Sequence, residues 1–155
     1  MISIDLLSHY PEHIPALARL WQRLLGPVCG HHTPLHEIEL WLQEWRNENK
    51  LPIAFVALAD NIPVGICSLQ VNDGIRPELK PWLGDLCVDP IYQGKGIAHM
   101  LITATKEQAK RLEFKSLYLY TFDATLPGYY QHLGWEVIGL EQSHNQPVTV
   151  MRIYL

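Results

Sequence analysis

The spacing of hydrophobic and polar positions predicts one sheet with helices packed against it. Short runs that are continuously apolar, or that alternate apolar and polar residues, are typical of strands. They occupy residues 2–6, 53–59, 64–71, 82–89, 117–121, 135–140 and 148–154. Apolar residues spaced by three and four predict helices over residues 10–25, 33–49, 97–112 and 127–132. The order of elements indicates a mixed α/β (α+β) fold with about seven strands and four helices.

Length and composition agree with a single domain. The chain has 155 residues, of which 48% are hydrophobic and 18% charged, the balance of an ordinary globular protein. No repeat, low-complexity stretch or linker divides it, so we expect one domain over residues 1–155. No run approaches the length of a membrane-spanning helix, and the N-terminus lacks the apolar core of a signal peptide.

The turn that follows the strand at residues 82–89 has the composition of an anion-binding site. Gly94 and Gly96 let a ligand approach the backbone without a Cβ in the way, and a helix begins at Ile97. Unpaired N–H groups and the positive end of the helix dipole attract phosphate oxygens at such a helix start. The stretch therefore predicts a phosphate-containing ligand, with a structural turn and helix cap as the alternative.

Two common nucleotide motifs do not fit this turn. A dinucleotide fingerprint requires Gly or Ala where His99 stands. A Walker loop requires Ser or Thr after the lysine, but Gly96 follows Lys95. The phosphate ligand is therefore of another kind.

Gln93, Gly96 and Ala98, preceded by Val88, Asp89 and Pro90, resemble the acyl-CoA motif of the GNAT superfamily of N-acetyltransferases. The order of predicted elements is similar to that of the family along essentially the whole chain. The resemblance implies the GNAT fold, a mostly antiparallel mixed sheet splayed between its fourth and fifth strands, and acetyl-CoA as co-substrate. It implies that the coenzyme contacts Leu86, Cys87, Val88, Gln93, Gly94, Lys95, Gly96, Ile97 and Ala98.

A second motif lies in the short helix at residues 127–132. Tyr129, Tyr130, Gly134 and Trp135 fit the family pattern of an aromatic residue, a tyrosine, three residues, a glycine and an aromatic residue. The resemblance implies that Tyr130 is the general acid that protonates the departing coenzyme A thiolate. A phenol with a pKa of about 10 can donate to a thiolate whose conjugate thiol has a pKa of about 8.5. A half-buried tyrosine with no catalytic part is the alternative.

The same resemblance implies a direct transfer. An uncharged amine attacks the thioester, and a backbone N–H near Val88 stabilises the oxyanion. The general base is open: Leu83 stands where family members often have a glutamate, which leaves Asp85 and, less favoured, Asp123. Either carboxylate could instead be a cap or turn residue.

Two further clusters have weaker functional readings. His31, His32 and His36 invite a metal site, but Thr33 and Pro34 interrupt their spacing, so no metal is expected and a solvated loop near the acceptor is favoured. Trp41 and Trp45 are typical of a core helix face more than of a cation box.

Charge and cysteine usage limit the partners. A formal charge of −4 argues against nucleic acid or an anionic membrane and suits a small-molecule or peptide amine. Three cysteines without paired spacing favour a reducing, cytoplasmic location, and the chain is expected to be a monomer or homodimer. The alternatives to an acetyltransferase are a non-catalytic acyl-CoA-binding sensor or interaction module of the same fold, and an unrelated α/β domain without a nucleotide.

Overall fold

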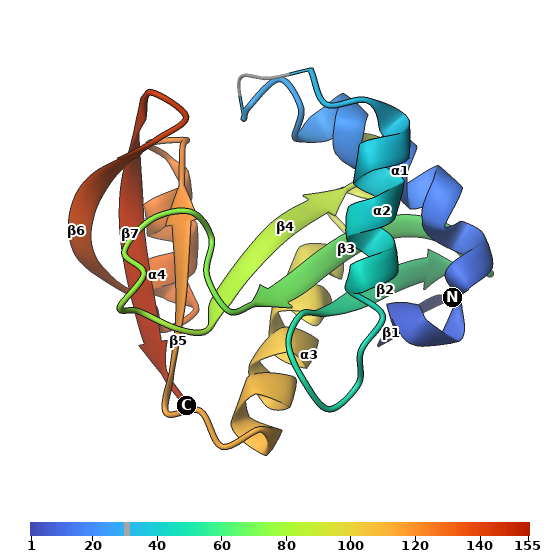
Figure 1. Cartoon of the computed structure of the whole chain (residues 1–155). Helices are drawn as coiled ribbons and strands as arrows, with labels where there is room; N and C mark the ends of the chain where they lie inside the picture. Colours follow the sequence, from blue (N-terminus) through green and yellow to red (C-terminus); the bar gives the residue numbers. More distant parts are fainter. Residues whose placement is uncertain (30–31) are drawn as a thin grey trace.

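The computed structural model describes residues 1–29 and 32–155, and its seven predicted strands form one sheet (Figure 1). The order across the sheet is β1-β2-β3-β4-β5-β7-β6, and every neighbouring pair is antiparallel except β4 and β5. The strands are β1 (Ile2–Leu6), β2 (Ile53–Ala59), β3 (Ile62–Gln70), β4 (Trp82–Val88), β5 (Ser116–Thr121), β6 (Glu136–Ser143) and β7 (Gln146–Tyr154). The predicted fold class is confirmed.

Helices cover both faces of this sheet (Figure 1). One face carries α1 and α2, the other carries α3, and α4 packs beside β6. The α-helices are α1 (Ile14–Leu24), α2 (Leu35–Glu44), α3 (Ile97–Arg111) and α4 (Leu126–His132), and short 3-10 turns η1 (Leu7–His9), η2 (Pro11–His13) and η3 (Pro90–Tyr92) lie between them.

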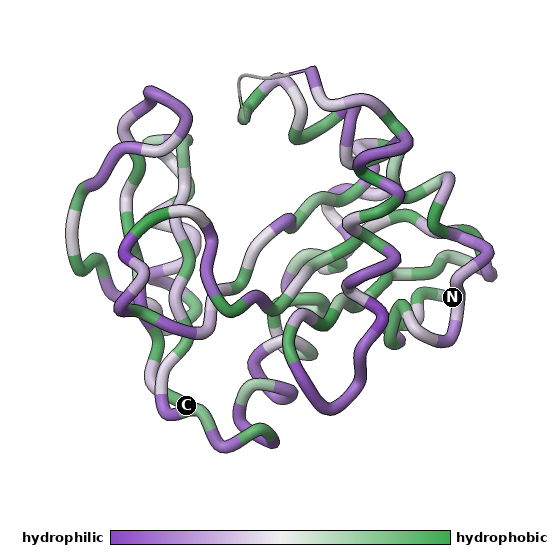
Figure 2. Tube along the Cα trace, in the orientation of Figure 1, coloured by the Kyte–Doolittle hydropathy of each residue, from purple (hydrophilic) through white to green (hydrophobic). Residues whose placement is uncertain are grey.

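Strand β2 explains why both faces need cover. All of its residues are buried, and they alternate between two hydrophobic clusters. Ala54, Val56 and Leu58 join the cluster under α1 and α2, whereas Ile53, Phe55 and Ala57 join the one under α3. A strand buried on both sides reads as a continuous apolar run, which is why its sequence shows no polar alternation. Hydrophobic residues accordingly follow the central strands in Figure 2.

Two helix boundaries differ from the prediction. The first helix was expected to open at Pro11, but α1 begins at Ile14 after a 3-10 turn. Pro15 explains the shift, because a proline is tolerated in the first turn of an α-helix and clashes with the carbonyl four residues earlier when it lies further in.

The second helix was expected to continue to about Asn49, but α2 ends at Glu44. Arg46 forms a β-bridge with Ile53, and the carbonyl of Trp45 accepts a hydrogen bond from the N–H of Ala54. The side-chain amide of Asn47 donates to the carbonyl of Glu44 at 3.0 Å. These hydrogen bonds to the start of β2 replace further helical hydrogen bonds, so the helix ends early.

Strands β4 and β5 diverge. Their parallel pairing is limited to Trp82 opposite Tyr118. Beyond that point β4 is paired only with β3 within the described residues, so the other edge of Leu83–Val88 carries unpaired backbone groups. The expected splay between these strands is confirmed.

A bulge in β4 sets the direction of the side chains next to this opening. Ser68 of β3 lies opposite Gly84, whereas Ile66 lies opposite Cys87, so the register shifts between them. Asp85 has a left-handed backbone with φ of 56°. Such a bulge changes the alternation of faces, and the carboxylate of Asp85 consequently turns toward Trp21 of α1.

Candidate functional site

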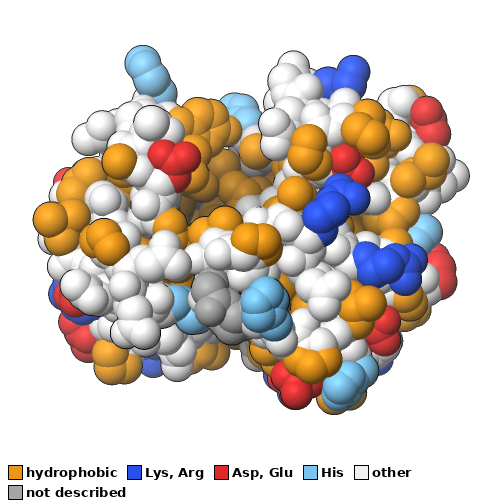
Figure 3. Space-filling view, turned by 90° about the horizontal axis from the view of Figure 1, so that it is seen from above, with side chains coloured by type: hydrophobic (Ala, Val, Ile, Leu, Met, Phe, Trp, Pro, Cys, Tyr) orange, Lys and Arg blue, Asp and Glu red, His pale blue; other side chains and the backbone are white. Residues whose placement is uncertain are grey.

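Two cavities meet between the diverging strands. The first, of about 640 Å³, lies between the ends of α1 and α2 on one side and β5 with the β6–β7 turn on the other. The second, of about 600 Å³, follows β4 to the turn before α3. Both are lined by Leu25, Leu86, Leu126 and Tyr130, so these residues mark the junction. Seen from above, the molecule is hollowed between its two halves, and hydrophobic side chains line the hollow (Figure 3).

The second cavity contains most of the residues expected to hold the coenzyme. Its lining includes the sequence-predicted residues Leu86, Cys87, Val88, Gln93, Gly94, Gly96, Ile97 and Ala98. Lys95 is exposed and is not among the described residues that line this cavity. Tyr92, His99 and Tyr129 also line it, although the motif does not single them out for this purpose.

Backbone geometry at the turn explains the two glycines. Gly94 and Gly96 have φ of 79° and 78°, in the left-handed region that disfavours a Cβ. Gly96 is the N-cap of α3, so the first N–H groups of the helix have no partner within the helix, and Gly96, Ile97 and Ala98 line this cavity. Asp89 closes β4 just before the turn, and its carboxylate accepts a hydrogen bond from the N–H of Ile91 at 3.1 Å.

The second motif forms a Schellman cap that holds Tyr130 in place. The N–H of Trp135 donates to the carbonyl of Tyr130 at 3.1 Å, and the N–H of Gly134 donates to that of Gln131 at 3.0 Å. Gly134 supplies the required left-handed residue, with φ of 97°. The rings of Tyr130 and Trp135 pack edge to face at 5.9 Å. The spacing of tyrosine, glycine and aromatic residue is therefore a helix-ending device that orients the tyrosine.

Tyr130 is the junction residue with an ionisable side chain that both cavities share. Only 6% of its surface is exposed. Burial raises the pKa of Tyr130 well above its usual range, and the nearby Cys67 and Tyr129 add to this shift. The hydroxyl therefore stays protonated at neutral pH and can act as a proton donor but not as a base.

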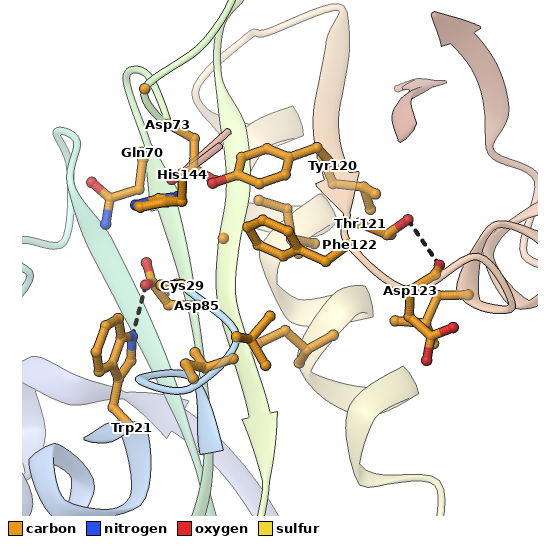
Figure 4. Close-up of a pocket in the computed structure, with 18 of the residues that line it drawn as sticks. Trp21, Cys29, Gln70, Asp73, Asp85, Tyr120, Thr121, Phe122, Asp123 and His144 are labelled. Atoms are coloured by element: carbon orange, nitrogen blue, oxygen red, sulfur yellow. Dashed lines mark hydrogen bonds between the residues drawn. The ribbon is translucent and has the colours of Figure 1, made fainter. Parts of the chain in front are cut away.

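Asp85 lies on the wall of the first cavity and is held by neutral donors (Figure 4). The indole N–H of Trp21 donates to its Oδ1 at 2.9 Å, and the hydroxyl of Ser68 donates to its Oδ2 at 2.6 Å. Burial raises the pKa of Asp85, while the bonds from Ser68, Trp21 and Gln70 oppose that shift. The pKa of Asp85 therefore reflects a balance between desolvation, which favours the neutral acid, and hydrogen bonds, which favour the carboxylate.

Asp73 is a second carboxylate of this cavity, and the sequence analysis missed it. It lies in the loop between β3 and β4, with Oδ2 3.2 Å from the position that a Cβ on Gly84 would occupy. Burial and the charge of Asp85 raise the pKa of Asp73 well above its usual range. In the sequence, Asn72, Asp73 and Gly74 read only as turn residues, and no local signal distinguishes Asp73 from them.

The other candidates from the sequence, Asp123, Trp41 and Trp45, also line the first cavity. Asp123 accepts hydrogen bonds from the N–H and hydroxyl of Thr125 at 2.8 and 2.7 Å, which hold the pKa of Asp123 below its usual range. It is a turn residue at the rim of the first cavity. Trp41 and Trp45 both line that cavity, so they contribute to its wall as well as to the core.

The histidine cluster is not part of either cavity as far as it is described. His31 lies outside the described residues, and His32 and His36 are absent from both linings. Within residues 1–29 and 32–155, no group of three or more His, Cys, Asp or Glu residues could hold a metal ion. The described helices are all too short or too polar to cross a lipid bilayer.

The turn between β6 and β7 closes one side of the first cavity. His144 lines the cavity, and its ring lies 6.2 Å from that of Phe122. The side-chain amide of Gln146 donates to the carbonyl of Val28, in the segment after α1, at 3.0 Å. This contact joins two segments 118 positions apart across the cavity.

Comparisons with known proteins agree with this geometry. The family model described as the acetyltransferase (GNAT) family matches residues 15–135. No curated protein sequence matches the chain significantly. Several solved structures share its fold despite low identity.

Three of these structures span almost the whole chain. YncA from Salmonella typhimurium, solved with its cofactor acetyl-CoA, is 13% identical, covers 99% of this chain and 94% of its own, and has a TM-score of 0.76. A chain of the NatC complex bound to Gag peptide and CoA is 17% identical with coverages of 99% and 98% and a TM-score of 0.75. Aminoglycoside 6'-acetyltransferase type Ii is 19% identical with coverages of 99% and 96% and a TM-score of 0.73.

Proposed function

Because the matched segment spans most of its length, the chain belongs to the GNAT acetyltransferase family, and we propose that it transfers an acetyl group from acetyl-CoA directly to a primary amine. The observation that carries this proposal is the position of Tyr130 at the junction of the two cavities. A donor bound along one cavity and an acceptor bound in the other would meet beside its hydroxyl.

The coenzyme is assigned to the cavity along β4 and the turn before α3. The pyrophosphate would accept hydrogen bonds from N–H groups of the turn and of the first helical residues, at Gly94, Gly96 and Ile97. The pantetheine arm would pair with unpaired backbone groups of Leu86, Cys87 and Val88, as an added strand does. YncA, which has the same fold, is solved with acetyl-CoA, which supports this assignment.

The chemistry requires an acid, an oxyanion donor and a proton acceptor. Tyr130 would protonate the departing thiolate, and its raised pKa means that the hydroxyl still carries its proton when the thiolate forms. A backbone N–H near Val88 would stabilise the oxyanion of the tetrahedral intermediate. Asp85 would accept the proton of the amine, directly or through water, because its pKa is raised and Asp123 has a lowered one.

The cellular setting follows from the same features. The acceptor is a small-molecule or peptide amine, since family structures include one with a bound peptide and one named for aminoglycosides. The thiols of Cys29, Cys67 and Cys87 are unbridged, which suits a reducing cytoplasm. We assign no nucleic-acid or membrane role to a protein of charge −4, and it would act as a monomer or homodimer.

The decisive experiment compares Tyr130→Phe with Tyr129→Phe while coenzyme A release is measured with a broad panel of amines. Tyr129 lies in the same helix and packs against Tyr130 at 5.3 Å, but it is 40% exposed, so it is the matched control. We expect Tyr130→Phe to lower kcat by about 10²-fold or more and to leave the thermal shift caused by acetyl-CoA in place.

Two other results would replace the proposal. Binding of acetyl-CoA without release of coenzyme A in any reaction, together with no effect of Tyr130→Phe, would indicate a non-catalytic sensor. The absence of any thermal shift at saturating acetyl-CoA would remove the coenzyme site itself.

A further inference from the structure

The carboxylate of Asp73 lines the first cavity, here called the acceptor cavity, and has no hydrogen-bond or ion-pair partner among the described residues. Among the described residues, none donates a hydrogen bond to it, and the only influences on its pKa are burial and the charge of Asp85. The lysine and arginine ion pairs of the described chain all involve other acids. The nearest arginine in the same loop, Arg76, is already paired with Glu78 and Glu141. Asp73 is half-buried, and a carboxylate that is partly withdrawn from water and has no partner favours a nearby positive charge.

Asp73 differs in this respect from its neighbour Asp85. The carboxylate of Asp85 is stabilised by Trp21 and Ser68, so the protein itself satisfies it. The side chains of Asp73 and Ser68 both approach Gly84. The position that a Cβ on Gly84 would occupy is 3.2 Å from Oδ2 of Asp73 and 3.5 Å from Oγ of Ser68. The described residues that line this cavity include no lysine or arginine, and His144 is their histidine.

Aromatic rings surround the same end of the cavity. Tyr120 of β5 points from the opposite wall, and its pKa is raised by burial and then by the charge of Asp73. Figure 4 shows Gln70, Asp73, His144 and the Tyr120 hydroxyl gathered at this end, with Phe122 drawn below Tyr120. A carboxylate with aromatic side chains and a phenol hydroxyl beside it forms a favourable environment for an ammonium or guanidinium group.

We propose that Asp73 binds a second cationic group of the acceptor, so that the substrate is a diamine or an amine that also carries a guanidinium. This inference rests on the proposed function, because it assigns the reacting nitrogen to the junction beside Leu86 and Tyr130. Asp73 touches Gly84, two residues before Leu86 along β4. Because β4 bulges at Asp85, between these two positions, the second cationic group would be separated from the reacting nitrogen by one short linear chain.

The test uses linear α,ω-diamines and n-alkylamines of matched chain length with the wild type and with Asp73→Asn. We expect wild-type kcat/KM to favour the diamine by at least about tenfold, with an optimum at intermediate chain length. Asp73→Asn should lose most of this preference through a higher KM for the diamine. Glu78→Gln, a surface acid of the same loop paired with Arg76, is the control and should retain the preference.

Direct binding separates this inference from catalysis. Calorimetry with the diamine alone should show wild-type binding that Asp73→Asn weakens at least about tenfold, whether or not the protein turns over. A wild type without diamine preference, an unchanged preference in Asp73→Asn, or an equal loss for both amine classes would overturn the assignment. Failure of every amine to release coenzyme A, with diamine binding intact, would instead count against the proposed function alone.

Discussion

The indole N–H of Trp21 and the carboxylate of Asp85 form a hydrogen bond of 2.9 Å between residues 64 positions apart. The bond ties α1 to the bulge of β4, at the point where the two cavities approach each other. Because Asp85 is desolvated, each neutral donor that it receives stabilises its charged form. Trp21 therefore links the stability of the α1 face to the protonation of the proposed base.

Replacement of Trp21 by Phe tests this link. The substitution removes the donor and one ring of a buried side chain, so the free energy of unfolding should fall by about 1–3 kcal/mol at neutral pH for the hydrogen bond and further for the lost volume. The pKa of Asp85 should rise further, which moves the acidic limb of the pH profile of kcat/KM to higher pH. Urea unfolding and a pH–rate profile measure the two effects. Trp41→Phe is the control, because Trp41 packs edge-on against Trp21 at 5.3 Å without bonding Asp85 and should not move the limb.

Asp73→Asn should stabilise the folded protein. Burial and Asp85 raise the pKa of Asp73 in the folded state above its unfolded value, so the folded state holds the proton more tightly. The wild type therefore loses stability relative to the variant as pH rises above about 4. Thermal unfolding from pH 4 to pH 8 should show a difference in melting temperature that grows with pH. A constant difference would show that the folded carboxylate titrates normally.

Gly96→Ala should weaken acetyl-CoA binding. The left-handed φ of 78° is strained for alanine, and the new methyl group would project at the coenzyme turn. We expect a stability loss of about 1 kcal/mol and an increase in the Kd for acetyl-CoA, measured by calorimetry. Gly74→Ala carries similar strain, with φ of 87°, in the loop between β3 and β4, and Gly74 is not among the described residues that line the coenzyme cavity. Equal changes in affinity in both variants would refute a specific part for Gly96.

Gln146→Ala removes the hydrogen bond that joins the β6–β7 turn to Val28. Since the bond is on the surface, the stability loss should stay near 1 kcal/mol or less. The KM for the amine should rise several-fold because the cavity is less well closed, while the KM for acetyl-CoA is kept. Steady-state kinetics with each substrate varied in turn measure the two KM values. Gln142→Ala, an exposed change on β6, should alter neither constant.

The alkaline side of the pH profile tests Tyr130. Its pKa is raised by burial, so the phenol keeps its proton to higher pH than an exposed tyrosine with a pKa of about 10. The value of kcat should therefore not decrease between about pH 8 and pH 10. A descending limb within that window that disappears in Tyr130→Phe would contradict the raised pKa.

Much of the local geometry at the proposed coenzyme site could be predicted from the chain because its signals are local. Gly94 and Gly96 adopt the left-handed backbone that glycine alone favours, and Tyr130, Gly134 and Trp135 form a helix end within six residues. Strand positions followed directly from apolar runs. The ends of α1 and α2 were predicted less well, because Pro15 and the bridge from Arg46 to Ile53 override the hydrophobic spacing.

The acceptor side was decided only by the tertiary structure. A left-handed bulge turns Asp85 toward Trp21, a loop brings Asp73 against Gly84, and strand β5 places Tyr120 opposite them. None of these contacts leaves a pattern in the neighbouring sequence, since each depends on the strand register and on the path of a loop between distant segments. The sequence by itself therefore determined the elements, the glycine turn before α3 and the helix end at Tyr130. Long-range packing determined which carboxylates meet in the cavity, because burial and charge depend on the whole fold.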